Sequence, residues 1–578
     1  MTDQRPPLSS PEAAGRDVPW WRRGVVYQVY PRSFADADGD GTGDVEGIRS
    51  RLPYLQRLGV DAIWISPWYP SPLNDGGYDV SDYRDIHPMF GTLADAERLL
   101  ADAAEHGIKV IVDLVPNHTS SEHPWFRAAL AAGPGSPERA RYLFRDGRGA
   151  RGDEPPTNWR SVFGGPAWTR VADGQWYLHL FDATQPDLNW DNEEVLAEFD
   201  DIFRFWLDRG VDGFRIDVAH GMVKDPSFPD LAGNQEPLGS DFDRNHAHWD
   251  RDGIHAINRR WRAVLDQASR EHGRDVMMVA EAWVSPDSLP LYLRPDEYHQ
   301  SFNFDFLEQP WGHAGTDAAI RRALRAAAAT ASTLTWTLSN HDVMRHATRF
   351  GLPADVNWRT WPLTGPYDVL DADLGLRRAR AAVMLLLALP GSTYIYQGEE
   401  LGLPEVWDLP AEVLDDPVWE SSGHTYKGRD GCRVPLPWEP TGPSLGFGAG
   451  PAWLPQPDRF RRFAASVQQG VPGSTLELYR QAIAVRRRLL TSDEALTWVD
   501  LGRDVLAFRR GSGIVCAVNY GHDIAMPAGR VLVSSTGDSD VLRTDACAWI
   551  DPAQRLSLAD RRLAREQRRA PRRSHPVG

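Results

Sequence analysis

The chain has 578 residues, of which 42% are hydrophobic and 25% charged, and its formal net charge is −17. This length exceeds one ordinary domain and predicts a large soluble body with one or two smaller modules. The acidic balance argues against nucleic acid as a partner and favours a neutral or small substrate. Three widely spaced cysteines provide neither a disulfide framework nor a zinc motif.

The two ends of the chain differ from its body. The first residues are polar and proline-rich, without the basic start and apolar core of a signal peptide, and no segment is apolar over a membrane-spanning length. We therefore expect residues 1–19 to be a disordered extension of a cytoplasmic protein, monomer or homodimer, with no membrane partner. Residues 551–578 are strongly basic; a solvated tail is the simpler interpretation, and an anionic partner is the alternative.

A repeated unit of amphipathic helix, glycine and apolar strand dominates the pattern. Its helices end at Gly59, Gly107 and Gly210, and the second begins at a capping box of Thr92 and Asp95. Five further apolar strands bring the total to eight: 25–31, 276–283, 302–306, 334–342 and 393–402. This alternation predicts an α/β fold with a parallel sheet. A closed (β/α)₈ TIM barrel is favoured over an open sheet, because no glycine-rich nucleotide loop follows any strand.

Two stretches depart from this alternation. Residues 119–191 are rich in glycine, proline and tryptophan, and they follow the third predicted strand. We expect them to form an inserted subdomain. Residues 496–550 contain short alternating strands and predict a small C-terminal all-β domain. The barrel would then comprise residues 20–118 and 192–495.

Polar residues cluster at four predicted strand ends. The side chains in question are Asp113, Asn117, His118, Arg215, Asp217, Glu281, His341 and Asp342. In a (β/α)₈ barrel the carboxyl ends of the strands meet at one mouth, where active sites lie. One strand-end aspartate is commonly a cap or a loop-closing residue. Four polar strand ends in order indicate a shared site.

Several carboxylates at one mouth suggest a retaining glycosidase. Like charges raise the pKa of at least one carboxyl group, whereas a neighbouring cation keeps another ionised. Arg215 lies two residues before Asp217 and on the same side of the strand, so we expect Asp217 to be the ionised nucleophile. Glu281, flanked by apolar residues, is expected to be the protonated general acid and base.

The remaining strand-end residues would complete the sugar site. We expect Asp342 to stabilise positive charge on the sugar, and His118 and His341 to donate hydrogen bonds to its hydroxyl groups. These segments, together with QPDLNW at 185–190, resemble the conserved regions of the α-amylase family of glycoside hydrolases (family 13), in its α-glucosidase and oligo-1,6-glucosidase branch. The resemblance implies the roles of nucleophile, acid/base and transition-state stabiliser for Asp217, Glu281 and Asp342, with Arg215 beside them.

The same resemblance implies an exo-acting enzyme. Asp75 and Tyr78 in NDGGYDVSDY match the family pair that grips and stacks on a terminal glucose. Arg433 in GRDGCRVPLPW matches the arginine that pairs with that aspartate. An Asp75–Arg433 bridge would close the pocket behind one sugar; a pair of surface loops is the alternative. The other residues that the resemblance places in the pocket are Phe163, Phe181 and Gln185.

The segment DADGDGTGD at 36–44 has the spacing of a cation loop. The carboxylates of Asp36, Asp38, Asp40 and Asp44 and the carbonyl group of Thr42 would supply oxygen ligands, although the loop lacks the final glutamate of an EF-hand. It resembles the loop that binds one Ca²⁺ or Mg²⁺ after the first barrel strand in this enzyme branch. We expect a structural metal and no organic cofactor. A hydrogen-bonded turn without metal is the alternative.

The resemblance covers roughly residues 20–550 and implies an exo-acting retaining α-glucosidase that acts on α-1,4-linked malto-oligosaccharides and maltose. Val218, after the nucleophile, is typical of α-1,6-specific relatives, whereas DVAHGMVKD favours the α-1,4 linkage. Alternatives are an oligo-1,6-glucosidase, or an α-glucosyl transferase or isomerase that acts on sucrose or maltose. A non-catalytic transporter subunit would lack the carboxylates, and a sugar-binding module would not need a nucleophile beside an acid.

Overall fold

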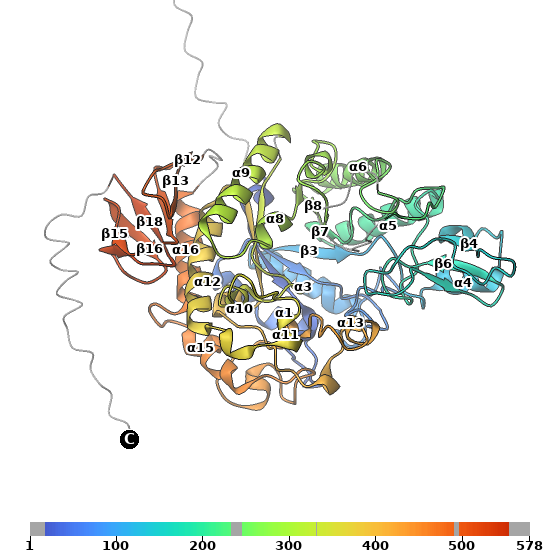
Figure 1. The fold of residues 1–578 in the computed structure, drawn as a ribbon, viewed down its shortest axis with the longest axis horizontal. Helices are drawn as coiled ribbons and strands as arrows, with labels where there is room; N and C mark the ends of the chain where they lie inside the picture. The colour runs from blue at the N-terminus through green and yellow to red at the C-terminus, as the bar shows by residue number, and fades with distance from the viewer. Residues whose placement is uncertain (1–17, 233–245, 331, 491–495, 554–578) are drawn as a thin grey trace, which may run out of the picture.

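The computed structural model describes residues 18–232, 246–330, 332–490 and 496–553. Most of the predicted N-terminal extension and nearly all of the basic tail lie outside these residues. An eight-stranded parallel sheet, in the order β10-β11-β1-β2-β3-β7-β8-β9, forms the centre of the molecule (Figure 1). Within the described ranges, no helix combines the length and apolarity needed to cross a membrane.

The strands of this sheet confirm the predicted barrel. Their bounds are Val25–Val29 (β1), Ala62–Ile65 (β2), Lys109–Leu114 (β3), Gly213–Ile216 (β7), Met277–Ala280 (β8), Gln300–Ser301 (β9), Thr335–Thr337 (β10) and Ser392–Tyr396 (β11). Nearly every strand residue is buried, as expected when helices cover a closed parallel sheet. Between β9 and β10 the barrel is joined by a side chain, since the Thr335 hydroxyl donates to the Ser301 carbonyl group.

One predicted strand is wrong. Residues 302–306 were expected to be extended, but the strand ends at Ser301 and helix α8 (Phe304–Leu307) follows. The reason is the cap at Asn303, whose side chain accepts a hydrogen bond from the Phe306 amide at 3.0 Å and starts the helix.

The long helices surround the barrel. They are α3 (Leu93–Glu105), α5 (Glu193–Asp208), α6 (Ile254–His272), α9 (His313–Thr330), α12 (Ala372–Ala388) and α16 (Thr475–Leu489), with α1 (Val45–Ser50) and α2 (Leu52–Leu58) after β1. The capping box of Thr92 and Asp95 is present, and Gly59 ends α2 with φ of 93°, a conformation that favours glycine. Short helices fill the connections: α7 (Leu289–Tyr292), α10 (His346–Arg349), α11 (Trp361–Thr364), α13 (Pro417–Ser421), α14 (Asp430–Arg433) and α15 (Ala465–Gln468).

Two further sheets lie at opposite ends of the molecule (Figure 1). Between β3 and α5 come α4 (Pro124–Ala132) and an antiparallel sheet of β4 (Phe144–Asp146), β6 (Gln175–Leu178) and β5 (Trp168–Arg170). The C-terminal sheet, in the order β12-β13-β14-β18-β16, consists of Leu496–Trp498, Val505–Arg510, Val515–Asn519, Ala546–Asp551 and Arg530–Ser534; β15 (Ile524–Ala525) and β17 (Val541–Leu542) pair beside it. It is fastened to the barrel where the Trp549 indole donates to the Met384 carbonyl group of α12.

Candidate active site

The barrel brings the four polar strand ends to one mouth. Asp217 follows β7, and its amide donates to the Leu114 carbonyl group at the end of β3. Glu281 follows β8 in the same way, with its amide bonded to the Ile216 carbonyl group at 2.9 Å. The polar side chains therefore extend from neighbouring strands whose registers are set by the sheet.

Arg215 joins three carboxyl groups. Its Nη1 lies 2.9 Å from Asp113 Oδ1 and 2.5 Å from Asp217 Oδ1, and its Nη2 lies 2.9 Å from Glu281 Oε2. The arginine side chain is 2% exposed. One buried cation faces three acids, so the cluster favours retention of a proton.

The pKa shifts in this cluster follow from burial. Burial raises the pKa of Asp217 well above its usual range, and the Arg215 guanidinium opposes this shift. Burial also raises the pKa of Asp113 to about 6, again against Arg215. Arg215 thus acts on Asp217 in the expected direction, whereas desolvation and the neighbouring carboxylates Glu281 and Asp113 act in the other direction and raise its pKa.

The surroundings of Glu281 are more polar than expected. Besides Arg215, its Oε2 accepts a hydrogen bond from the Val218 amide at 3.0 Å. Its Oε1 accepts one from the Trp283 indole at 3.0 Å. The flanking alanines suggested an apolar setting, but the tertiary structure surrounds this carboxyl group with donors, which position it beside Asp217.

Asp342 occupies the most cationic part of the site. Although burial opposes ionisation, His341, Arg429 and Arg433 hold the pKa of Asp342 well below its usual range. The His341 Nε2 lies 3.2 Å from Asp342 Oδ2, and the ring stacks on Tyr78 at 5.2 Å between centroids. An aspartate that stays ionised beside the sugar can stabilise positive charge.

Both histidines predicted to bind sugar are buried. Burial lowers the pKa of His118 to about 4 and that of His341 to about 3, so both rings are neutral near pH 7. The Gln185 amide lies 3.1 Å from His118 Nε2 and donates to Asp75 Oδ2 at 3.0 Å. Through these contacts Gln185, the first residue of the QPDLNW segment, joins the inserted segment to Asp75 and His118 of the barrel.

Asp75 forms an ion pair with an arginine, but the predicted partner, Arg433, is wrong. Asp75 Oδ1 pairs with Arg429 Nη2 at 2.6 Å. Arg433 instead donates to the His341 carbonyl group at 2.9 Å and lies 3.2 Å from Asp342 Oδ1. Arg429 is the N-cap residue of α14 and Arg433 is the last residue of this single turn, so the path of the turn decides which arginine reaches Asp75. The segment GRDGCR contains both candidates, so the available signal was ambiguous.

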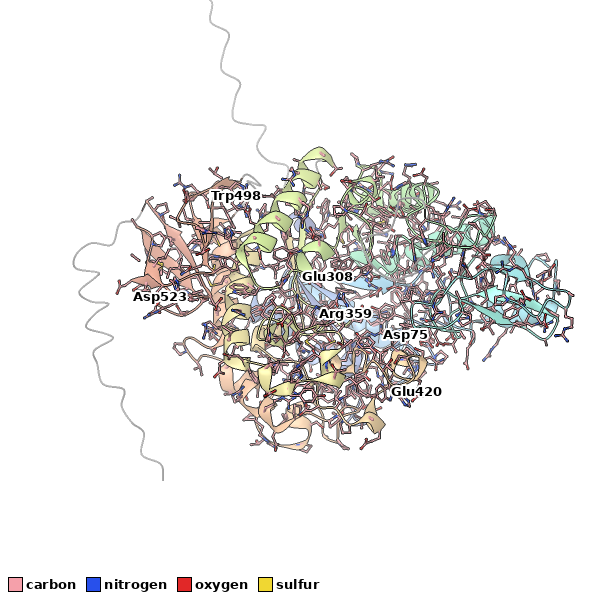
Figure 2. All side chains as sticks on the ribbon, viewed as in Figure 1. Asp75, Glu308, Arg359, Glu420, Trp498 and Asp523 are labelled. Atoms are coloured by element: carbon pink, nitrogen blue, oxygen red, sulfur yellow. The ribbon has the colours of Figure 1, made fainter. Side chains whose placement is uncertain are left out.

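A cavity of about 340 Å³ contains most of these groups. Its lining includes eight predicted residues: Asp75, Tyr78, His118, Phe163, Phe181, Asp217, Glu281 and Asp342. Four further predicted residues contact this lining: Arg215 contacts Asp217, His341 stacks on Tyr78, Gln185 donates to Asp75, and Arg433 lies beside Asp342. Val218, which the sequence analysis connected with linkage preference, also lines the cavity. Sequence reasoning missed the remaining lining residues, which lie on loops except for Val418 in α13: Val162, His220, Trp283, Val343, Trp358, Arg359, Val418, Tyr426 and Arg429. In Figure 2 the labelled Asp75 and Arg359 mark this region on the side of the barrel that faces the inserted sheet.

A buried ion pair ties the inserted segment to the site. Lys224 Nζ lies 2.7 Å from Asp187 Oδ2 in the QPDLNW segment, and neither side chain is more than 2% exposed. The same ammonium group donates to Asn117 Oδ1 at 2.8 Å and to the Gly221 carbonyl group at 2.6 Å. One cation therefore links the end of β3, the inserted segment and the loop after the nucleophile.

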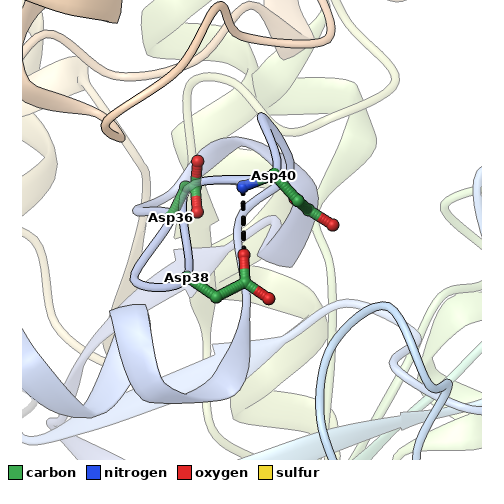
Figure 3. Close-up of side chains that lie close together, drawn as sticks. All are labelled: Asp36, Asp38 and Asp40. Carbon is green, nitrogen blue, oxygen red and sulfur yellow. Dashed lines mark hydrogen bonds between the residues drawn. The ribbon is translucent and has the colours of Figure 1, made fainter.

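The acidic loop gathers three of its predicted ligands. Oxygen atoms of Asp36, Asp38 and Asp40 lie within 4.8 Å of one another (Figure 3). In the part of the chain that the structure describes, none of the three forms an ion pair with a basic side chain, so a hard cation fits there. Asp44 lies outside this group of three. Both its oxygens accept main-chain hydrogen bonds, from Ala37 and Gly47, and both oxygens of Asp36 do the same, from Gly39 and Gly41. The main-chain amide of Thr42 donates a hydrogen bond to Asp40 Oδ1 at 2.7 Å.

Comparison with known proteins places most of the chain in one family. Residues 28–493 match the family model described as "Alpha amylase, catalytic domain". A probable alpha-glucosidase of Rhizobium meliloti is 36% identical over 532 residues, which are 88% of this chain and 91% of the relative. An oligo-1,6-glucosidase of Parageobacillus thermoglucosidasius is 35% identical over 81% of this chain and 84% of the relative. A trehalose-6-phosphate hydrolase of Escherichia coli is 36% identical over 83% and 85%.

Solved structures show the same architecture. The crystal structure of an alpha-glucosyl transfer enzyme superposes with a TM-score of 0.79 at 36% identity, covering 92% of this chain and 100% of the other. The trehalulose synthase of Pseudomonas mesoacidophila MX-45 superposes with a TM-score of 0.80 at 29% identity, covering 93% and 100%. Hydrolases and glucosyl-transferring enzymes are thus both among the similar proteins.

Proposed function

The chain belongs to the α-amylase family of glycoside hydrolases, and from that premise we propose that it is an exo-acting retaining α-glucosidase. Its substrates would be α-1,4-linked malto-oligosaccharides and maltose, from which it releases α-D-glucose at the non-reducing end. The observation that carries this proposal is the ion pair of Asp75 with Arg429, because both side chains line the cavity that holds Asp217 and Glu281.

A closed end distinguishes a pocket from a cleft. Arg429 contacts Asp75, Asp342 and Asp416 at 2.6, 3.1 and 2.6 Å, so its guanidinium is held on three sides. Charge-assisted hydrogen bonds of this kind are strong and directional. We infer that this ion-paired group closes the cavity behind one sugar, so that a sugar chain enters by its end and single glucose units are removed.

The carboxyl pair supports a double displacement. Asp217 and Glu281 share the two terminal nitrogens of Arg215, which agrees with the short separation of about 5 Å typical of retaining glycosidases. Glu281 donates its proton to the glycosidic oxygen as the bond from that oxygen to C1 breaks, and an Asp217 oxygen bonds to C1. A water molecule then attacks C1 and gives a proton to Glu281, and the Asp217 carboxylate leaves.

The charges of the pocket support a neutral substrate. Four lining residues are acidic, namely Asp75, Asp217, Glu281 and Asp342, and two are basic. Both basic residues are already paired, Arg429 with Asp75 and Arg359 with Glu308. A phosphorylated sugar would therefore meet an acidic pocket without a free cation among its lining residues. This favours a neutral glucoside over a substrate like that of the trehalose-6-phosphate hydrolase.

A second candidate function is glucosyl transfer or isomerisation on sucrose or maltose. The observation that favours it is the extensive superposition with an alpha-glucosyl transfer enzyme and a trehalulose synthase. Both functions use the same glucosyl-enzyme and differ in whether water or a sugar accepts the glucosyl group. An oligo-1,6-glucosidase remains a third alternative, supported by the relative from Parageobacillus.

Product analysis tests the proposal. The purified enzyme is incubated separately with maltose, isomaltose, sucrose and trehalose, and the first product is followed by anomeric NMR. We expect the fastest turnover on maltose, with α-glucose appearing before mutarotation. The configuration is read with p-nitrophenyl α-glucoside, because all the glucose released from it comes from the cleaved glucosyl group. Initial release of β-glucose from it contradicts the retaining mechanism, and isomeric disaccharides as main products from the natural sugars favour the second candidate function.

We also propose a structural Ca²⁺ or Mg²⁺ at Asp36, Asp38 and Asp40. The close approach of three carboxylates without a basic partner among the described residues supports it. When bound, the ion would supply charge neutralisation. The loop leads directly into α1, whose N-cap is Asp44, so its effect would be on stability.

A further inference from the structure

A second cavity lies beside the catalytic one. Its volume is about 560 Å³, compared with about 340 Å³ for the cavity that contains Asp217 and Glu281. Its lining residues belong to segments 308–311 and 349–358, which follow β9 and β10, and to segment 369–378 at the start of α12. The loops after the carboxyl ends of barrel strands form one mouth, so the second cavity lies on the side of the barrel where substrates bind.

Two contacts place the cavities next to each other. Trp358 lines both of them. Arg359, which lines the catalytic cavity, forms an ion pair with Glu308, which lines the second cavity, and Figure 2 labels both side chains. These two side chains are 51% and 34% exposed, so the border between the cavities is open to solvent. A chain that leaves the catalytic cavity past Trp358 therefore meets the second cavity.

The second cavity offers ring surfaces together with accessible oxygen acceptors. The indole rings of Trp311 and Trp358 are half-buried. Asp371 is exposed, and only its Oδ1 is used within the described residues, where it accepts a hydrogen bond from the Leu374 amide. A glucose unit has apolar C–H groups, which pack against indole rings, and hydroxyl groups, which donate to carboxylate oxygens. The lining thus suits a sugar.

Charge in the second cavity is balanced. Its charged lining residues are two acids and two bases, namely Glu308, Asp371, Arg349 and Arg378. Arg378 pairs with Asp545 at 3.2 Å, and Arg349 donates to the Leu338 carbonyl group at 2.9 Å. An ionic ligand would meet like charge as well as opposite charge there, so a neutral ligand with hydroxyl groups fits better than an ion.

We propose that the second cavity binds the reducing-end part of a malto-oligosaccharide whose non-reducing glucose lies in the catalytic cavity. This inference rests on the proposed function and adds a preference for long chains to it. In that function Asp75 and Arg429 hold the terminal glucose, so the rest of the chain extends toward the mouth. Maltose has a single glucose unit beyond the cleaved bond, whereas maltopentaose has several and reaches the second cavity.

Filling the second cavity tests the inference. Ala354 is an exposed lining residue, so Ala354→Trp introduces a large ring without removing a buried side chain. We expect the ratio of kcat/KM for maltopentaose to kcat/KM for maltose to fall about 10-fold, as for the loss of one or two hydrogen bonds. Ala150→Trp places the same ring at an exposed turn that lines neither cavity, and it should leave the ratio unchanged. A wild-type ratio in Ala354→Trp would overturn the inference.

Binding gives a readout independent of turnover. In an inactive Asp217→Asn background, calorimetry should show that maltopentaose binds about 10-fold more tightly than maltose, with one molecule bound per chain. Ala354→Trp should remove this difference, and Ala150→Trp should preserve it. Equal dissociation constants for the two sugars before either substitution would overturn the inference. Two maltopentaose molecules per chain would also overturn it, because the two cavities would then bind separate molecules.

Failure of the proposed function gives a different result. Inactivity of the wild-type enzyme on every α-glucoside would contradict the α-glucosidase proposal. The calorimetric comparison of maltopentaose with maltose would still decide whether the second cavity binds a glucose chain.

Discussion

Arg429 pairs with Asp75 at 2.6 Å across 354 residues of sequence, and both side chains line the cavity that contains Asp217 and Glu281. The same guanidinium contacts Asp342 at 3.1 Å. Burial raises the pKa of Asp75, and Arg429 opposes this shift. Arg429 therefore limits the rise in the pKa of Asp75, and in the proposed function the pair would present polar partners to sugar hydroxyl groups.

The first prediction concerns this pair. Arg429→Met leaves Asp75 and Asp416 buried without their cation, so we expect kcat/KM for maltose to fall at least about 100-fold. Steady-state kinetics with maltose measure this loss. Arg459→Met, which breaks an exposed ion pair with Asp408, is the control and should stay within about 2-fold of the wild type. Near-normal activity of Arg429→Met would contradict the closed pocket.

The second prediction concerns the pH profile. Asp217 must be ionised to attack, and its pKa is raised by burial and by the negative charges of Glu281 and Asp113. Activity is therefore lost as the pH falls through this raised pKa. Asp113→Asn removes one of these charges, so the acid limb of kcat/KM should move to lower pH, by about one unit.

Rates measured between pH 4 and 8 check this shift. Asp201→Asn, at an exposed site on α5, is the control and should leave the acid limb in place. A movement of the limb to higher pH in Asp113→Asn would show that the Arg215 cluster does not set the ionisation of the nucleophile.

The third prediction concerns the buried pair of Lys224 and Asp187. Lys224→Met leaves Asp187 buried and unpaired, and breaking such a pair costs about 3–5 kcal/mol. We expect a lower free energy of unfolding in denaturant titrations and faster proteolysis within residues 119–191. The double variant Lys224→Met/Asp187→Asn should recover part of this loss, since it removes the uncompensated charge. No recovery would mean that packing, rather than charge, is the main contribution of Lys224.

The fourth prediction concerns the acidic loop. If a cation binds Asp36, Asp38 and Asp40, removal of divalent ions with EDTA should lower the melting temperature by several degrees, and added Ca²⁺ should restore it. Asp36→Asn should melt at the lower temperature and no longer respond to Ca²⁺. Asp458→Asn, an exposed aspartate outside the loop, should respond like the wild type. Identical melting with and without EDTA in the wild type argues against a structural metal.

Local patterns in the sequence were enough to predict the barrel and the polar strand ends at its mouth. Helix caps such as Thr92 and Asp95, and glycines such as Gly59, are local signals, because they satisfy main-chain groups within a few residues. The alternation of helix and buried strand then leaves few topologies. Asp217 and Glu281 could be placed at one site because parallel strands end on the same side of a barrel.

Which side chains contact one another in the site could be read only from the folded chain. Arg429 and Arg433 are indistinguishable by spacing, and the path of α14 brings the first to Asp75 and the second to Asp342. The donors around Glu281 come from Val218 and Trp283, and His220 is positioned by its stack on Trp249. Such contacts depend on loop conformations and on burial over long sequence separations. Their energies are set by desolvation and packing in three dimensions, which no local pattern records.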